Sequence, residues 1–409
     1  MNPAKYLASL LPTWRDYRSL KRTWRGDLLA GVTVGIVALP LALAFGVSSG
    51  AGAEAGLVTA IVAGLVAAVF GGSNIQVSGP TGAMVVVLGP IVVTHGPGVV
   101  AMVSVMAGVV VLIGGLLKLG RVVSFIPWPV IEGFTLGIAV IIFLQQVPAA
   151  IGAKAGASTN ALVAAVESFA TVNPATLWWA LGSVVVVAAI MVVAPRIHRQ
   201  LPGSLIAIAL VTVVATLASL PLARIGALPS SLPAPGLPAL DPAVVGSLVG
   251  PALTVAALAA IESLLSARVG ASLADTGAYE PDRELVGQGL ASLASGLFGG
   301  MPATGAIART AVNVRSGGRT RVAAITHSLV LLAVVSLAAT VVSGIPLAAL
   351  SGVLMVTAVR MVSIPTVRAV VRSTRSDAIV FFITAIVTVS FDLIIAVGIG
   401  IAVAAFFAL

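Results

Sequence analysis

The chain has 409 residues, of which 59% are hydrophobic and only 9% are charged. Soluble globular domains carry about 25% charged residues, so this composition excludes a water-soluble protein. The chain has no cysteine, nucleophile–base pair or phosphate-binding loop, which argues against a thiolate metal site, a cofactor and an enzyme. Its net charge of +9 is better explained by basic cytoplasmic loops than by nucleic-acid binding.

Apolar runs recur along the whole chain. A helix that crosses a bilayer needs about 20 mostly apolar residues, and the runs lack the alternation of a β-barrel, so we predict an all-α membrane protein. The fourteen predicted segments are residues 28–50, 53–70, 80–95, 97–117, 127–146, 175–195, 203–222, 246–267, 285–300, 304–315, 322–343, 346–361, 378–391 and 393–409.

The basic residues orient these segments. If residues 1–26 form a cytoplasmic N-terminus and each segment reverses direction, every Lys and Arg lies on the cytoplasmic side except Lys154, Arg224 and Arg309. Positive charge collects on the cytoplasmic side of membrane proteins. We therefore predict a multi-pass protein of the inner (cytoplasmic) membrane, with both termini cytoplasmic and a proline-rich external linker at residues 223–245.

The third and tenth segments are short and share a motif. Phe-Gly-Gly, an irregular stretch and Thr-Gly-Ala occur at residues 70–83 and again at 298–306. Both copies occupy the third place of a seven-segment half, and an odd number of segments inverts the halves, 27–222 and 246–409. Paired interrupted segments indicate a transporter binding site, although small residues also permit close helix packing. We expect short half-helices after extended strands, with their N-termini meeting at mid-membrane.

The first free N–H groups of two such half-helices, together with their dipoles, favour an anion. The hydroxyls of Thr81 and Thr304 either donate to that anion or cap the helices. Arg309 either adds positive charge or pairs with a glutamate. Phe45, one turn beyond Pro40, lines the cavity or faces lipid. The predicted anion-binding residues are Thr81, Gly82, Ala83, Thr304, Gly305, Ala306, Ile307, Arg309 and Phe45.

Glu262 lies near the middle of the eighth segment. Burial favours the protonated form of a carboxylate, so Glu262 can carry a proton. With Ser266, one helical turn away, it can instead hold a sodium ion; no other metal site is expected. A third interpretation is a structural ion pair between Glu262 and Arg309 or Arg268.

Four stretches resemble the SulP anion transporters, including the cyanobacterial bicarbonate carriers. They are "VALPLALAFGVSSGAGAEAGL" (37–57), "SGPTGAM" (78–84), "IESLLSARVG" (261–270) and "RELVGQGLASLASGLFGGMPATGAIARTAVNVRSGGRT" (283–320). The resemblance covers essentially the whole chain. It implies two inverted seven-segment repeats, in which the first four segments of each half form a core domain and the last three a gate domain.

The resemblance also assigns residues. It implies that the anion lies between the third and tenth segments at Thr81 and the Gly305–Ala306 backbone, and that Glu262 and Ser266 match positions that bind a coupling ion. Ile307, within the anion-binding segment, replaces a threonine that helps to bind sodium in some bicarbonate carriers, which favours proton coupling. Arg309 matches a basic position found in many members.

The sequence therefore predicts a secondary transporter of a small anion, such as fumarate, bicarbonate or sulfate, working by proton-coupled symport and alternating access. The alternatives are a sodium-coupled bicarbonate symporter and an uncoupled anion channel or exchanger. The resemblance implies a homodimer, and a cytoplasmic STAS domain that we expect this chain to lack. The expected partners are the anion, a proton or sodium, and the lipid bilayer.

Overall fold

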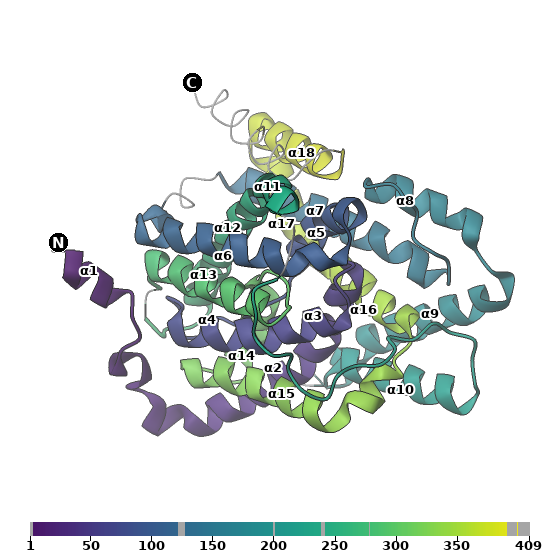
Figure 1. Ribbon diagram of the computed structural model, residues 1–409, viewed down its shortest axis with the longest axis horizontal. Helices are drawn as coiled ribbons and strands as arrows, with labels where there is room; N and C mark the ends of the chain where they lie inside the picture. The colour runs from purple at the N-terminus through teal and green to yellow at the C-terminus, as the bar shows by residue number, and fades with distance from the viewer. Residues whose placement is uncertain are drawn as a thin grey trace. The chain divides into compact units, whose positions relative to one another are not determined.

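The computed structural model describes residues 3–121, 127–198, 201–238, 242–277, 279–390 and 399. Within these ranges the chain is mostly helical, and two short strands form a single sheet (Figure 1). The chain divides into two compact units, each built from separate stretches of sequence.

Unit 1 comprises Met1–Met84, Thr94–Val123 and Ile225–Gly344. Its elements are α1 (Pro3–Ser9), η1 (Trp14–Tyr17), α2 (Leu20–Ser48), α3 (Ala53–Val58), the π-helical turn η2 (Thr59–Ala63), α4 (Gly64–Phe70), β1 (Ser78–Gly79), η3 (Pro97–Val99), α6 (Val100–Leu116), α11 (Pro242–Ser247), α12 (Val249–Leu273), α13 (Pro281–Leu297), β2 (Thr304–Gly305), α14 (Ile307–Arg315) and α15 (Arg321–Ser343). Helix α5 (Gly82–His95) begins in this unit.

Unit 2 comprises Val85–Val93, Ser124–Arg224 and Ile345–Leu409. Helix α16 packs against α7 and α9, and α18 packs against α7. Its helices are α7 (Trp128–Ala150), α8 (Ala161–Ser168), η5 (Phe169–Thr171), α9 (Pro174–Ile197), α10 (Gly203–Leu217), α16 (Leu347–Met361), α17 (Ile364–Ser373) and α18 (Arg375–Ser390).

Eight spans of the described residues are long and apolar enough to cross a membrane, and several predicted segments correspond to shorter helices. The predicted segment 80–95 begins as a helix only at Gly82, and 304–315 begins as a strand. Helix α2 begins at Leu20, before the apolar run, because the basic residues that precede the run still favour helix. Helix α8 was not predicted, and segment 393–409 lies almost entirely outside the described residues.

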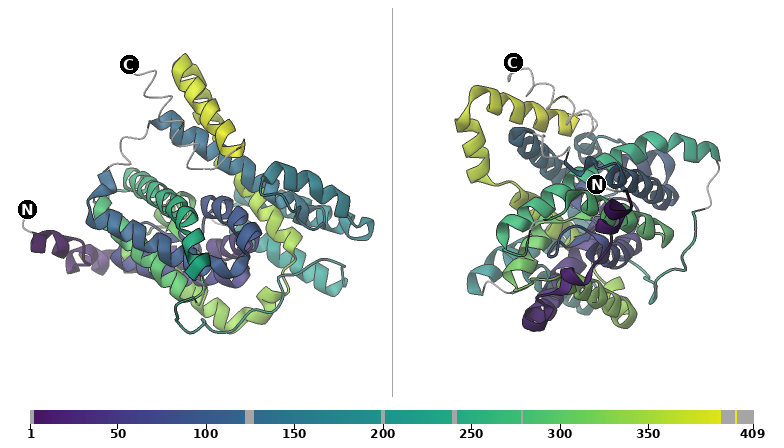
Figure 2. Two further views of the ribbon diagram at one scale, coloured as in Figure 1. Left: turned by 45° about the horizontal axis from the view of Figure 1, so that its top comes forward. Right: turned by 90° about the vertical axis from the view of Figure 1, so that its left-hand side faces the viewer.

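Helices α6 and α13 lie side by side in unit 1 (Figures 1 and 2). A Cβ added at Gly108 would come within 2.6 Å of the backbone nitrogen of Leu293, and one at Gly289 within 2.5 Å of the backbone nitrogen of Leu112. Small residues permit such close backbone contact, which stabilises helix pairs where lipid removes the hydrophobic driving force. The glycines therefore set the separation of α6 and α13.

Gly108→Ala should consequently destabilise unit 1, because the new methyl group meets backbone that cannot rotate away. Gly114→Ala, on the same helix, is the matched control, since its nearest atom would be 4.0 Å distant. The control should be neutral or gain up to about 1 kcal/mol of helix propensity. Thermal unfolding in detergent measures the difference. Equal midpoints for both variants would contradict this packing argument.

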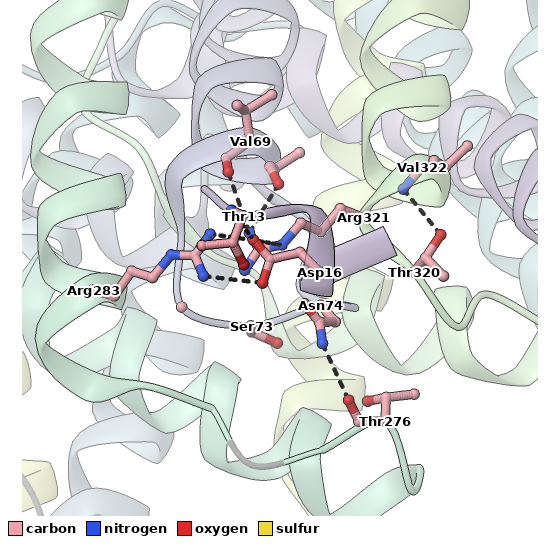
Figure 3. Close-up of polar contacts among 12 residues, drawn as sticks. Thr13, Asp16, Val69, Ser73, Asn74, Thr276, Arg283, Thr320, Arg321 and Val322 are labelled. Atoms are coloured by element: carbon pink, nitrogen blue, oxygen red, sulfur yellow. Dashed lines mark hydrogen bonds and ion pairs between the residues drawn. The ribbon is translucent and has the colours of Figure 1, made fainter. Parts of the chain in front are cut away.

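The N-terminal segment is tied to unit 1 by Asp16 (Figure 3). Its carboxylate accepts a hydrogen bond from Arg283 Nη2 at 2.7 Å and lies 3.7 Å from Arg321 Nε. Arg321 also donates to the carbonyls of Ala68 and Val69 at the end of α4. Asp16 therefore neutralises two buried guanidinium groups, on α13 and α15.

Asp16→Asn should detach this segment and lower the unfolding midpoint, since removing one partner of a buried ion pair costs roughly 3 kcal/mol. Burial raises the pKa of Asp16, but hydrogen bonds from Arg283 and the Thr13 N–H, with the charge of Arg321, bring that pKa below its usual value. The stabilisation is thus complete above the usual aspartate pKa, about 4, and is lost as pH falls through the lowered value.

Unfolding midpoints of the wild type and Asp16→Asn should therefore differ at neutral pH and converge in acid. Asp275→Asn, an exposed aspartate, is the control and should show no difference at either pH. A constant gap between the wild type and Asp16→Asn from pH 7 to pH 3 would show that the carboxylate charge is not what holds the segment.

Candidate functional site: two paired connectors in unit 1

The two copies of the duplicated motif meet in unit 1. Strand β1 pairs antiparallel with β2, with Ser78 opposite Gly305 and Gly79 opposite Thr304. Helices α5 and α14 begin directly after these strands and contain 14 and 9 residues. Two segments that are far apart in the sequence thus place their helix starts on either side of one short sheet.

Side chains hold the irregular chain that precedes β1. Asn313 Nδ2 donates to the carbonyl of Ile75 at 2.7 Å, and the N–H of Val77 donates to Thr310 Oγ1 at 3.1 Å. Backbone polar groups away from water are costly when unpaired. Side chains of α14 therefore satisfy backbone polar groups of residues 71–77, the extended connector between α4 and β1, as a membrane protein requires.

The chain leading to β2 is held in the same way. The N–H of Met301 donates to Thr59 Oγ1 at 2.8 Å, and the N–H of Gly305 donates to Ser263 Oγ at 3.1 Å. Thr59 belongs to the π-helical turn η2, and such turns are frequent at functional sites. Both connectors are thus held in place by buried side chains.

Glu262 joins the two motif copies. Its Oε2 atom accepts a hydrogen bond from Thr81 Oγ1 at 2.8 Å and lies 2.8 Å from Thr304 Oγ1. The two hydroxyl oxygens are 3.0 Å apart. Because a hydroxyl has one proton, Thr304 donates either to the carboxylate or to Thr81. One carboxylate oxygen therefore lies within hydrogen-bond distance of both threonine hydroxyls.

These contacts argue against one interpretation of Thr304 and one of Glu262. Thr304 does not cap α14, because the N-cap is Ala306. No Lys or Arg side-chain nitrogen of the described residues lies within 4.0 Å of the Glu262 carboxylate. The structure therefore lacks, among those residues, the ion pair of Glu262 with Arg309 or Arg268 that was one of the interpretations. Glu262 is half-buried, whereas both threonines are buried.

Arg309 contacts β1 rather than Glu262. Its Nη2 atom donates to the carbonyl of Pro80, and Nη1 has no hydrogen-bond partner among the described residues. The side chain is 2% exposed, and a Cβ at Gly79 would lie 2.7 Å from Nη1. The guanidinium group therefore brings a buried positive charge against the strand.

The remaining predicted residues have different surroundings. Gly305 faces Gln76, whose Nε2 would be 1.6 Å from an added Cβ, so glycine is required there. The N–H of Ala306 donates to the carbonyl of Val77 at 2.9 Å. Gly82 and Ala83 are buried in the first turn of α5.

Three more of the predicted residues also form no hydrogen bond with the Glu262 carboxylate. Ser266 Oγ lies 3.5 Å from Thr310 Oγ1, the atom that accepts a hydrogen bond from the N–H of Val77. Ile307, at the start of α14, is 42% exposed, and Phe45 is buried in α2. Within the described residues no group of three or more acidic or histidine side chains is placed to hold a metal ion.

Several residues of the site were not predicted. Ser263, Thr310 and Asn313 each bind connector backbone, and their signal in the sequence is weak because Ser, Thr and Asn are common in membrane helices. The polar residues of α13 gave a clearer signal, a spacing of four residues from Glu284 to Gln288 within an apolar stretch. That spacing predicts one helix face.

The model of the sulfate permease family matches residues 24–384. The chain is 38% identical over 388 residues to the putative sulfate transporter YvdB of Bacillus subtilis, covering 92% of this chain and 72% of that protein. It is 35% identical over 398 residues to the bicarbonate transporter BicA of Picosynechococcus sp., covering 94% and 70%.

Solved structures are also similar. The transmembrane domain of a cyanobacterial BicA matches with a TM-score of 0.84 and 34% identity, over 92% of this chain and 98% of that one. Murine Slc26a9, an anion transporter in the inward-facing state, matches with a TM-score of 0.86 and 19% identity, over 99% and 72%. The second match concerns the fold alone.

Proposed function

Because the chain belongs to the sulfate permease family of membrane anion transporters and not to the enzymes, we propose that it is a proton-coupled symporter of a small anion. The proposed binding site lies at the paired starts of α5 and α14. The observation that carries the proposal is the contact of one Glu262 oxygen with both Thr81 and Thr304.

The contact links the proton to the anion. While Glu262 is ionised, it accepts from the threonine hydroxyls and its negative charge repels an anion. When Glu262 is protonated, the charge is removed and it can donate to one hydroxyl, which frees a threonine O–H for the anion. Each ligand then favours the binding of the other, and such mutual dependence is what symport requires.

The proposed anion donors are the threonine hydroxyls and the first-turn N–H groups of α5 and α14, from Gly82 and Ala83 and from Ile307 onward. Helix N-termini bind carboxylate, carbonate-like and sulfate groups alike. We therefore propose fumarate, bicarbonate or sulfate as the candidate substrates. The relatives named for sulfate and bicarbonate transport support this range.

The proposed topology has fourteen membrane segments in two inverted repeats, 27–222 and 246–409, joined by the linker 223–245. The antiparallel pairing of β1 with β2 is the arrangement that a two-fold axis between the motif copies would produce. Apart from Val85–Val93 of the third segment, which belong to unit 2, unit 1 holds the first four predicted segments of each half, as a core domain would, and unit 2 holds the others, as a gate domain would.

In this proposal, transport proceeds by alternating access in the inner membrane, with residues 1–26 and the C-terminus in the cytoplasm and two copies of the chain forming a homodimer. Sodium coupling through Glu262 and Ser266 is the second candidate. The Ser266 hydroxyl lies near Thr310 Oγ1 and, among the described residues, forms no hydrogen bond with Glu262, which favours the proton.

Uptake into proteoliposomes tests the proposal. Labelled bicarbonate, sulfate and fumarate are supplied singly under an inward proton gradient, an inward sodium gradient or neither. We expect one or more of these anions to enter faster with the proton gradient. Stimulation by sodium alone would support the second candidate, and uptake indifferent to both gradients would indicate a channel or an exchanger.

A further inference from the structure

Helix α13 has a buried polar face. Glu284, Gln288, Ser292 and Ser295 follow one another at intervals of four, four and three residues, and each is at most 1% exposed. This spacing places them in one row along the helix. Polar side chains inside a membrane protein are costly unless they have partners, so the row must serve another segment.

The C-terminal part of the row holds the chain before β2. The N–H of Ala303 donates to Ser292 Oγ at 3.2 Å, and Ser295 Oγ donates to the carbonyl of Met301 at 2.7 Å. Thr304, the next residue after Ala303, contacts Glu262. This part of α13 is therefore one residue removed from the proposed anion site.

The N-terminal part of the row holds the chain before α5. The N–H of Gly72 donates to Glu284 Oε2 at 2.7 Å. The Nε2 atom of Gln288 uses both of its protons: it donates to Glu284 Oε1 at 2.9 Å and to Ser78 Oγ at 2.6 Å. Ser78 lies in β1, three residues before Thr81. Gln288 thus connects a rigid helix to the strand that precedes the site.

Helix α13 is itself held firmly. Its close contact with α6 is reinforced by Ser104, whose hydroxyl donates to the carbonyl of Ser292 at 2.7 Å. At its first turn, Arg283 is bound by Asp16 (Figure 3). A side chain that projects from this helix can therefore fix the position of a neighbouring strand.

We propose that Gln288 is a positioning residue of the anion site: through Ser78 it sets the place of β1, and β1 sets the direction of the Thr81 hydroxyl. This inference rests on the proposed function, because it assumes that Thr81 contacts the anion. Gln288 itself does not touch the anion. Its loss should therefore weaken binding and leave the transport cycle intact.

Initial-rate uptake by the full chain in proteoliposomes tests this, with whichever of labelled bicarbonate, sulfate or fumarate the wild type carries fastest. Gln288→Met keeps the length of the side chain and removes both donors. We expect its KM to rise roughly five- to tenfold, the effect of about one lost hydrogen bond, with Vmax changed by less than about twofold.

Ser78→Ala removes the same hydrogen bond from the other end and should raise KM to a similar extent. The double variant should be no worse than either single one, because residues that act through one contact are not additive. Gln145→Met, which removes an amide from α7 in unit 2, is the matched control and should leave KM unchanged.

Thr81→Val separates the inference about Gln288 from the proposal that the anion binds at Thr81. A raised KM in Thr81→Val with a normal KM in Gln288→Met overturns only this inference. Normal KM values in both overturn the proposed site.

Additive effects of Gln288→Met and Ser78→Ala would also overturn the inference. If Gln288→Met does not fold, Ser78→Ala decides alone, because it breaks the same contact with a smaller change of side chain. A wild-type KM in Ser78→Ala would then contradict the proposal.

Discussion

Glu262→Gln should still bind the anion but lose the response of uptake to a proton gradient. The amide mimics the protonated carboxyl: it carries no charge and can donate to one threonine, which frees a threonine O–H for the anion. It cannot release a proton, however. The variant therefore stays in the state that a proton would otherwise create.

The size of the effect can be estimated. One unit of pH is worth about 1.4 kcal/mol per proton, so a one-to-one symporter can accumulate a substrate about tenfold for each unit. Uptake at a fixed anion gradient, with and without an inward gradient of one pH unit, measures this gain. The wild type should approach it, and Glu262→Gln should show none.

The matched control is Glu132→Gln on α7, a half-buried glutamate that accepts a hydrogen bond from Trp128 Nε1 at 2.9 Å. Its pH response should equal that of the wild type. Two results would refute the role of Glu262: a pH response that survives in Glu262→Gln, or wild-type uptake that is stimulated by sodium and not by acid.

Arg309→Ala should reduce transport strongly while leaving the fold intact. The guanidinium group donates to the carbonyl of Pro80 and places positive charge beside β1. Its Nη1 atom has no partner among the described residues and is the donor that we expect the anion to use. Hydrogen bonds to charged groups contribute about 1.5–3 kcal/mol, so the loss in affinity should be roughly 10- to 150-fold. The KM for uptake in proteoliposomes measures it.

Two further substitutions separate charge from geometry. Arg309→Lys retains the charge but not the planar fork, whereas Arg309→Gln retains a donor for the Pro80 carbonyl without charge. Recovery by lysine would assign the effect to electrostatics, and recovery by glutamine to support of the strand. Arg315→Ala, an exposed arginine at the end of the same helix, is the control. Unchanged transport by well-folded Arg309→Ala would show that the backbone donors suffice.

Composition and local pattern alone determined that this is a helical membrane protein, because the need to satisfy backbone groups in lipid leaves few alternatives for long apolar runs. The repeated Phe-Gly-Gly and Thr-Gly-Ala elements pointed to the two segments that now form β1 with α5 and β2 with α14. Glu262 was recognisable because a carboxylate in an apolar run is rare.

The partners of these residues were decided only by the tertiary structure. Thr81 and Glu262 are separated by 181 residues in the sequence, and hydropathy and spacing describe neighbours along the chain, not contacts across it. For the same reason, the sequence could not predict three further contacts. They are the hydrogen bond of Arg309 to Pro80, the ion pairs of Asp16 with Arg283 and Arg321, and the hydrogen bond of Gln288 to Ser78. Each depends on which helix faces which connector, and close packing at glycine positions such as Gly108 sets that arrangement only once the helices have come together.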